Sequence, residues 1–253
     1  MTLIENLVAV SIVSHGHGEM VSKLVKNLLL YPEVSRIIVT KNISEILNLP
    51  QSDIIHLVEN SIPRGFGANH NESFLMTTEK FYCVLNPDIT FLENPFPGLI
   101  ASAEEFKAGL VVPVILNLDG EIADSLRAFP TPFSLLKRIL SQRQKNTDPI
   151  DSFENFSPQW AAGMFMLFTN NCYRDLNGFD EGYYLYCEDI DICIRLWKRK
   201  FRIVACSKIR VIHDARRASR KNFKHLQWHL TSMLRYMLKH LLSLPKVSSG
   251  SSK

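Results

Sequence analysis

The sequence predicts an α/β domain built on a Rossmann-like, largely parallel sheet between helices, followed by a helical C-terminal extension. Short apolar runs alternate with amphipathic stretches over the first 115 residues, as expected for βα units. The 253 residues are enough to bury one such core without disulfide or metal support. With 46% hydrophobic and 21% charged residues, the composition excludes a disordered or collagen-like chain.

Apolar periodicity places the elements of the first half of the chain. The expected helices cover 20–30 and 65–79, and the expected strands cover 7–13, 36–40, 53–58, 81–85 and 110–116. Pro87 ends the fourth strand, because proline cannot donate to the strand ladder.

The second half is less regular. We expect strands at 161–168 and 202–206, helices at 188–200 and 223–242, a short helix after the Pro-rich segment 129–133, and a mobile loop at 141–158. The last helix has apolar residues at three- and four-residue steps, and this stripe is expected to pack on the body: Leu226, Leu230, Met233, Met237 and Leu241. The expected divisions are a main domain over 1–214, a basic amphipathic extension over 215–245 and a disordered tail over 246–253.

Several classes of protein are excluded or disfavoured. No apolar run approaches the roughly 18–20 residues that span a bilayer, and the N-terminus lacks the pattern of a secretory signal, so we expect a cytoplasmic protein. The five cysteines form no CxxC pair, which favours reduced, buried thiols over a disulfide framework or a zinc ribbon.

The charge is unevenly distributed along the chain. Residues 195–253 hold 16 Lys and Arg against one acidic residue, Asp214, for a net charge of +15, whereas residues 1–194 have a net charge of −11. A basic segment on an acidic body favours contact with an anionic partner such as phospholipid headgroups, a pyrophosphate carrier or nucleic acid. The alternative is a solvated basic face.

Two motifs follow expected strands. Gly16-His17-Gly18 partly matches the dinucleotide-binding fingerprint, but the third glycine and an acidic residue after the second strand, at 40–42, are both missing, which disfavours a nicotinamide enzyme. Asn86-Pro87-Asp88 puts a carboxylate at the strand edge where open α/β sheets bind ligands. That carboxylate could hold a divalent cation that neutralises a diphosphate, although the tripeptide is also an ordinary turn.

An acidic motif lies further along the chain. Residues 180–191 contain five carboxylates beside aromatic residues. Glu188 and Asp189 open the expected helix, and Asp191 can pair with Arg195 one turn later, which leaves Glu188 or Asp189 to accept a proton. The alternative is a set of helix caps and surface pairs. His213 follows an apolar pair and is either structural or a ligand.

In this order, the motifs resemble the inverting family-2 glycosyltransferases, most closely the rhamnosyltransferase-like branch of bacterial surface-polysaccharide synthesis. The resemblance covers roughly 7–240 and is carried by VAVSIVSHG, ENSIPRGFGANHN, NPD, SLRAFPTPFSLL, AAGMFMLF, NGFDEGYYLYCEDIDICIRL and VIHDARRAS. It implies a GT-A-type fold with a mixed sheet over 1–214. It also implies transfer of a sugar, with L-rhamnose from dTDP-rhamnose favoured, to a hydroxyl of a saccharide or lipid-pyrophosphate-linked acceptor.

The resemblance also implies roles for individual residues. Asp189 would be the general base, with Glu188 beside it, and Asp88 and His213 would hold Mg²⁺ or Mn²⁺ at the diphosphate. Asn86 departs from the Asp-x-Asp form common in the wider family. The remaining candidates are Ser14, Asn42, Arg64, Gly67, Asn69 and Asn86 for the nucleotide, and Trp160, Gly163, Asp180 and Glu181 for the acceptor. Residues 65–67 are expected as a flexible loop over the nucleotide or as a helix N-terminus, and Trp160 as a sugar-stacking or a core residue.

Two other functions remain open from the sequence. A nucleotidyltransferase acting on a sugar phosphate would also use a Rossmann-like half and a carboxylate-held metal, but the segment 14–20 lacks its Gly-rich basic signature. A non-catalytic membrane- or polyanion-binding module would have no use for Asp88 and the acidic motif. We expect no nucleic-acid partner, and a peripheral position on the inner face of the cytoplasmic membrane through contact of the basic C-terminal region with anionic lipid.

Overall fold

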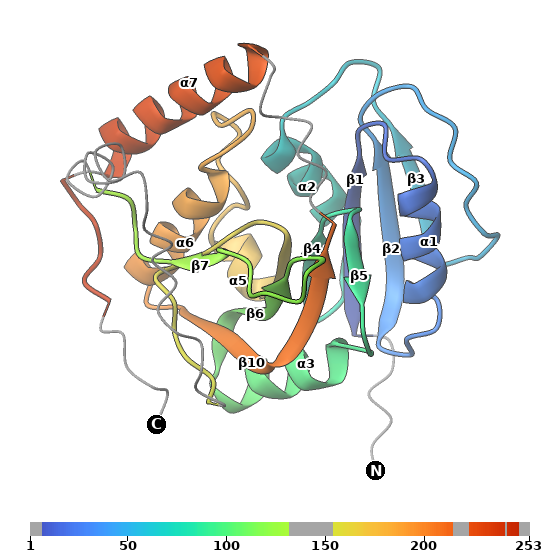
Figure 1. Ribbon diagram of the computed structural model, residues 1–253, viewed down its shortest axis with the longest axis horizontal. Helices are drawn as coiled ribbons and strands as arrows, with labels where there is room; N and C mark the ends of the chain where they lie inside the picture. The colour runs from blue at the N-terminus through green and yellow to red at the C-terminus, as the bar shows by residue number, and fades with distance from the viewer. Residues whose placement is uncertain (1–6, 132–153, 215–222, 241, 248–253) are drawn as a thin grey trace.

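The computed structural model describes residues 7–131, 154–214, 223–240 and 242–247 (Figure 1). Its main feature is an eight-stranded mixed sheet in the order β3-β2-β1-β4-β9-β6-β10-β5, and β7 and β8 form a separate two-stranded sheet. The strands are β1 Val8–Ser14, β2 Val34–Lys41, β3 Ile55–Glu59, β4 Phe81–Leu85, β5 Ile89–Phe91, β6 Ala108–Leu116, β7 Leu126–Arg127, β8 Trp160–Ala161, β9 Phe165–Thr169 and β10 Arg202–His213. The helices are α1 Glu19–Leu28, α2 Phe66–Phe74, α3 Phe96–Glu105, α5 Asn170–Asp175, α6 Glu188–Lys198 and α7 Phe223–His240.

Helices cover both faces of the sheet, because the central strands are apolar on both sides. In β4, Phe81 and Cys83 join the core under α1 and α3, whereas Tyr82 and Val84 join the core under α5 and α6. The expected mixed sheet flanked by helices is confirmed.

The directions of the strands determine where the site lies. Strand β1 pairs in parallel with β2 and β4, β2 with β3, and β6 with β10. Strand β9 runs antiparallel between β4 and β6. The carboxyl ends of the parallel strands and the start of β9 therefore meet at one edge. The expected strand at 161–168 is wrong in extent, because residues 162–164 separate β8 from β9.

Four elements were not expected, and two others differ clearly in length. The unexpected elements are helices α3 and α5 and strands β5 and β7, and α2 ends at Phe74 instead of Glu79. Strand β10 continues beyond the expected end at Cys206, so that His213 is its last residue.

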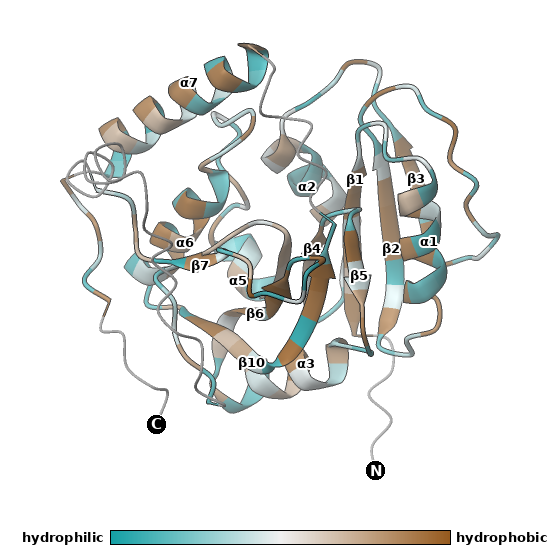
Figure 2. Ribbon diagram, viewed as in Figure 1, coloured by the Kyte–Doolittle hydropathy of each residue, from teal (hydrophilic) through white to brown (hydrophobic). Residues whose placement is uncertain are grey.

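Helix α7 is oriented differently from the expectation. The side that packs on the body carries Ser232, Tyr236 and His240, with Met233 and Met237 at its margin. Leu226 and Leu230, which were expected to pack on the body, are more than half exposed. Brown, apolar residues recur along the whole of this helix at the rim of the molecule (Figure 2). The helix packs in this orientation because basic side chains on its other side bind two carboxylates of the body, which are described below.

All five cysteines are buried and free, as expected. Within the described ranges, no helix combines the length and the apolar character that crossing a bilayer requires. The expected short helix after 133, most of the loop at 141–158, Arg216, Arg217 and nearly all of the tail lie outside the described residues.

Candidate active site

A network of amide side chains closes the carboxyl ends of β2 and β3. The Asn42 amide donates to the Arg64 carbonyl oxygen at 2.9 Å, and the Arg64 N–H donates back to Asn42 Oδ1 at 2.8 Å. Asn60 Nδ2 donates to Asn42 Oδ1 and to Asn69 Oδ1, at 2.8 and 2.6 Å. The structure therefore brings Asn42, Arg64 and Asn69 together around Asn60, a residue that the sequence did not single out. Buried Asn69 is engaged within this network.

The loop after β1 binds a carboxylate that the sequence analysis also missed. Glu45 accepts hydrogen bonds from the N–H groups of Gly16 and Gly18, at 2.9 and 3.0 Å. Partial burial opposes ionisation, but these hydrogen bonds hold the pKa of Glu45 below its ordinary value. Glu45 therefore holds the loop after β1 in place, next to the strand end where Ser14 is buried.

The segment 65–67 is the N-terminal turn of α2 and not a flexible loop, so the helix alternative is the one that the structure shows. A Cβ on Gly67 would lie 2.6 Å from Phe179 Cβ, and one on Gly65 would lie 2.8 Å from the Tyr184 carbonyl oxygen. These glycines permit α2 to pack against the 179–184 segment. The side chain of Arg64, which precedes α2, forms an ion pair with Glu72 of that helix.

Asp88 and His213 meet at the sheet edge, from the turn after β4 and the end of β10. Asp88 Oδ2 lies 3.0 Å from His213 Nε2, and the Asp88 carbonyl accepts from the Asp214 N–H at 2.9 Å. The other carboxylate oxygen, Oδ1, is buried without a hydrogen-bond partner. Among the described residues no group of three or more acidic, His or Cys side chains forms a metal site. An unpartnered carboxylate oxygen beside an imidazole fits a cation that takes its other ligands from phosphate and water.

Asp189 lies close to this edge, in the first turn of α6. Its Oδ2 accepts from the Gly163 N–H at 3.2 Å, and its Oδ1 accepts from the Ile190 N–H at 2.8 Å. The neighbouring Met164 carbonyl accepts from the Asn86 N–H at 2.9 Å, so the loop before β9 links the acidic motif to Asn86-Pro87-Asp88. The hydrogen bonds to Asp189 lower its pKa, but burial raises it by more, so the net pKa of Asp189 lies above the ordinary value. A raised pKa suits a general base.

Glu188 is also buried, and its Oε2 has no hydrogen-bond partner. Burial and the adjacent Asp189 carboxylate both raise the pKa of Glu188. The two preceding residues, Tyr186 and Cys187, adopt left-handed conformations with φ of 73° and 65°. Non-glycine residues rarely adopt this conformation, and here it turns the chain sharply into the helix that carries both carboxylates.

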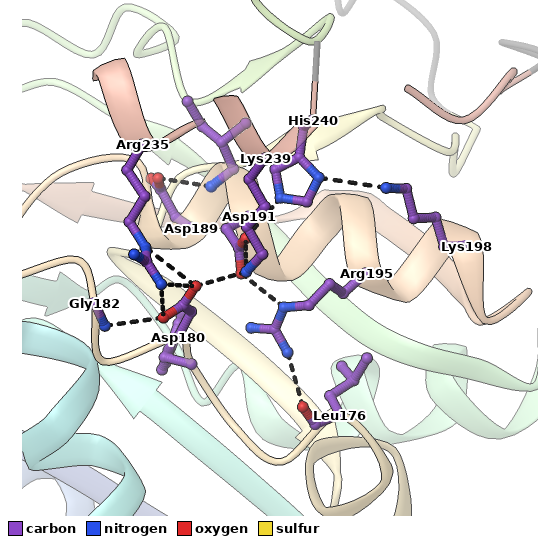
Figure 3. Close-up of polar contacts among 12 residues, drawn as sticks. Leu176, Asp180, Gly182, Asp189, Asp191, Arg195, Lys198, Arg235, Lys239 and His240 are labelled. Carbon is purple, nitrogen blue, oxygen red and sulfur yellow. Dashed lines mark hydrogen bonds and ion pairs between the residues drawn. The ribbon is translucent and has the colours of Figure 1, made fainter. Parts of the chain in front are cut away.

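Two other members of the acidic motif bind α7 (Figure 3). Asp191 is fully buried and accepts from Arg195 Nε, while Lys239 Nζ and His240 Nε2 each lie 2.6 Å from its Oδ1. Asp180 accepts from Lys239 Nζ at 2.6 Å and from Arg235 Nη2 at 2.9 Å. Burial opposes ionisation of Asp180 and Asp191, but these contacts lower the pKa of both carboxyl groups. Both are therefore ionised, and they hold the helix on the body.

The remaining candidates for acceptor binding are Trp160, Glu181 and Gly163. Trp160 is only 8% exposed, and the Arg127 guanidinium lies 5.3 Å from its ring centroid, which favours the core alternative over sugar stacking. Glu181 Oε1 accepts from Asn71 of α2 at 3.0 Å. Gly163 contacts the proposed base directly through its N–H.

Two cavities differ in their relation to this edge. A cavity of about 230 Å³ is lined by residues at the ends of β2 and β3, including Asn42 and Asn60. A larger one of about 720 Å³ opens at the opposite edge, where β4 and β6 begin, near Phe81 and Ala108. The smaller cavity adjoins the polar network, and we attach no function to the larger one.

Comparison with known proteins identifies the family of this chain and the fold that it shares with solved structures. The chain is 31% identical to rhamnosyltransferase WbbL of Escherichia coli K12 over 252 residues, which cover 94% of this chain and 95% of the relative. The chain belongs to the rhamnosyltransferase-like glycosyltransferases. An N-acetylglucosaminyl-diphospho-decaprenol L-rhamnosyltransferase of Mycobacterium tuberculosis H37Rv is 26% identical over 58% of this chain and 51% of its own length. No protein-family model matches the chain.

Solved structures show the same fold for this glycosyltransferase. GalNAc-T7, crystallised with UDP, GalNAc and Mn²⁺, has a TM-score of 0.63 at 14% identity and covers 84% of this chain and 44% of its own. Staphylococcus aureus TarS 1–349 with UDP-GlcNAc has a TM-score of 0.57 at 13% identity and covers 83% of this chain and 59% of its own.

Proposed function

We propose that this glycosyltransferase moves L-rhamnose from dTDP-rhamnose to a hydroxyl of a lipid-linked or oligosaccharide acceptor in cell-surface polysaccharide synthesis, with inversion at the anomeric carbon. The observation that carries the proposal is the junction at the sheet edge. Asn86 bonds to Met164, and the adjacent Gly163 bonds to Asp189, so the proposed diphosphate and proton-accepting groups border one site. The names of the two rhamnosyltransferase relatives support the donor sugar.

In this mechanism Asp189 removes the proton from the acceptor hydroxyl as its oxygen attacks the anomeric carbon. The Gly163 and Ile190 N–H groups hold the carboxylate in one orientation, and burial raises the pKa of Asp189 so that it accepts a proton more readily. General-base assistance of this kind contributes about 10²- to 10⁴-fold to the rate. Attack from the face opposite the diphosphate inverts the anomeric configuration.

The leaving diphosphate is assigned to the edge at Asp88. Asp88 and His213 would hold Mg²⁺ or Mn²⁺, which would neutralise phosphate charge when bound. We assign the nucleotide to the neighbouring ends of β1, β2 and β4, near Ser14, Asn42 and Asn86. Arg64 and Arg216 or Arg217 are the candidate phosphate-binding cations. Gly67 and Asn69 act there by holding α2 and the 60–65 turn in position.

The acceptor is assigned to the side formed by Gly163 and the 180–189 segment, with Asp180 and Glu181 positioning that segment. A lipid-pyrophosphate-linked acceptor would place the enzyme on the inner face of the cytoplasmic membrane, and the decaprenol in the name of the mycobacterial relative supports this assignment. The excess of Lys and Arg after residue 195 favours an anionic surface, and no role is assigned to nucleic acid.

The test is a thermal-shift panel of nucleoside diphosphates and nucleotide sugars with and without Mg²⁺ or Mn²⁺, followed by transfer to a lipid-linked saccharide. Stabilisation by dTDP and dTDP-rhamnose, and a product of inverted anomeric configuration by NMR, is the expected result. Stabilisation by another nucleotide alone would overturn the donor assignment, and retention of configuration would overturn the single-displacement mechanism.

A further inference from the structure

Helix α7 exposes one continuous apolar side, which we call the outer apolar stripe: Phe223, Leu226, Leu230, Leu234 and Leu238. The exposed fractions of these side chains range from 56% at Leu226 to 81% at Leu238. Steps of three and four residues place them on the same side of the helix. Isolated exposed leucines are common on proteins, but a row over about four turns marks an interaction surface.

The contacts on the other side of α7 prevent the stripe from turning inward. Ser232 Oγ donates to the Leu185 carbonyl oxygen at 2.8 Å, and Tyr236 is fully buried. Arg235 and Lys239 are bound to Asp180. Rotating the helix to bury its leucines would break these ion pairs and expose a buried tyrosine. The outward direction of the stripe is therefore set by the docking of the helix.

Charge indicates what covers the stripe. Lys224 and Arg235 lie along one border of the stripe, and the sequence contains no Asp or Glu after Asp214. Apolar side chains bordered by cations fit the boundary between acyl chains and anionic headgroups. A second copy fits less well, because pairing through this helix would bring two strongly cationic regions together.

We propose that the outer apolar stripe of α7 inserts into the headgroup region of an anionic lipid surface. The attachment differs from a purely electrostatic one, because the leucines enter the lipid while Arg235 and Lys239 remain bound to Asp180. This inference rests on the proposed function only for its biological setting.

The same helix would bring the acceptor side to the lipid. Tyr186 OH lies 2.9 Å from His225 Nδ1 of α7, and Ser232 holds Leu185, so α7 contacts the segment that ends at Glu188 and Asp189. A lipid-bound α7 therefore places the proposed base next to the surface that holds a lipid-pyrophosphate-linked hydroxyl.

The test is flotation of the full chain with vesicles of phosphatidylglycerol and phosphatidylethanolamine, without donor or acceptor. The variant carries Leu230→Gln, Leu234→Gln and Leu238→Gln, and we expect a partition coefficient at least about tenfold below that of the wild type. The matched control carries Leu75→Gln, Leu92→Gln and Leu118→Gln, which are equally exposed leucines elsewhere, and should bind within about twofold of the wild type.

Each outcome decides the inference. Residual binding of the wild type at 0.5 M salt, absent from the α7 variant, supports insertion, because salt screens charges but not apolar contacts. Equal binding of wild type and α7 variant, or a wild type that does not float, overturns it. A leucine-dependent dimer in analytical ultracentrifugation without vesicle binding would assign the stripe to a second copy instead. A failed transfer assay would affect only the proposed function, since flotation uses no substrate.

Discussion

Asp191 is the clearest place to test how α7 is held. The substitution Asp191→Asn preserves the size of a fully buried side chain but removes its charge. Three donors then face a neutral amide, and its NH₂ group must point at one of them: Arg195, Lys239 or His240. Removing one partner from a buried ion pair costs about 3–5 kcal/mol.

We expect the low end of this range, because Lys239 keeps its contact with Asp180 and is 34% exposed. A loss of about 3 kcal/mol lowers Tm by roughly 6–12 °C for a chain of this size. The measurement is thermal and urea unfolding of wild type and variant, with Asp119→Asn, an exposed aspartate, as the control.

The pH dependence gives this prediction a second, independent check. Burial opposes ionisation, but His240, Arg195 and Lys239 hold the pKa of Asp191 far below its ordinary value. A carboxyl with a lowered pKa in the folded state stabilises the protein above its unfolded pKa of about 4 and loses this contribution as pH falls. The difference between wild type and Asp191→Asn should therefore be complete at pH 7 and shrink below about pH 4. A loss under about 1 kcal/mol at pH 7, or one that is unchanged at pH 3, would refute the reasoning.

Four further predictions concern the site. Asp189→Asn should abolish transfer and leave donor binding intact in calorimetry; retention of more than about a tenth of wild-type kcat would reassign the base to Glu188. Because the raised pKa of Asp189 must be exceeded for it to accept a proton, the acid limb of the wild-type kcat/KM profile should have its midpoint above the ordinary aspartate pKa of about 4, and a limb at or below this pH would contradict the assignment. Asp88→Ala should weaken nucleoside diphosphate binding and its response to Mg²⁺; binding indifferent to both would remove the metal assignment. Gly67→Ala should cost about 1–3 kcal/mol in urea unfolding, since its Cβ would lie 2.6 Å from Phe179, and a neutral effect would show that α2 can shift without strain.

The parallel core could be predicted from the sequence because its signal is local. Strands β1, β2 and β4 are short apolar runs, and the turn at Pro87 is explicit in the sequence. The antiparallel insertion of β9 between β4 and β6 was not predictable in the same way, because strand order depends on pairing between distant segments. Helix α3 has Pro97 and Gly98 in its first turn, residues that are also typical of a loop.

The sequence singled out charged residues that the structure brings together, but it did not single out the amide network around Asn60. Asp88 and His213 lie 125 positions apart in the chain and are in contact at 3.0 Å, and their role as metal ligands stays a prediction. Asn60 and Glu45 carry no motif, and only the adjacent ends of β1, β2 and β3 show what they bind.

The error on α7 has a physical cause. Its apolar period was interpreted as a buried face, because burying leucine is usually favourable. The structure buries the opposite face, where Lys239 and His240 meet the Asp191 carboxylate, and an unpaired buried carboxylate would cost more than exposed leucines. The spacing of apolar residues shows that a helix has two faces, but the location of its charged partners determines which face packs inward.

The buried cysteines offer a means of timing local motion. Burial raises the pKa of the thiols of Cys83 and Cys187, so neither reacts readily with alkylating reagents while the chain is folded. Cys83 lies in the central strand β4, whereas Cys187 lies in the left-handed turn just before Glu188, beside α7. Labelling at Cys83 therefore requires the sheet to open, and labelling at Cys187 requires only the turn to open. The ratio of the two labelling rates, read peptide by peptide in a mass spectrometer, would report how often the segment that holds the base opens independently of the fold.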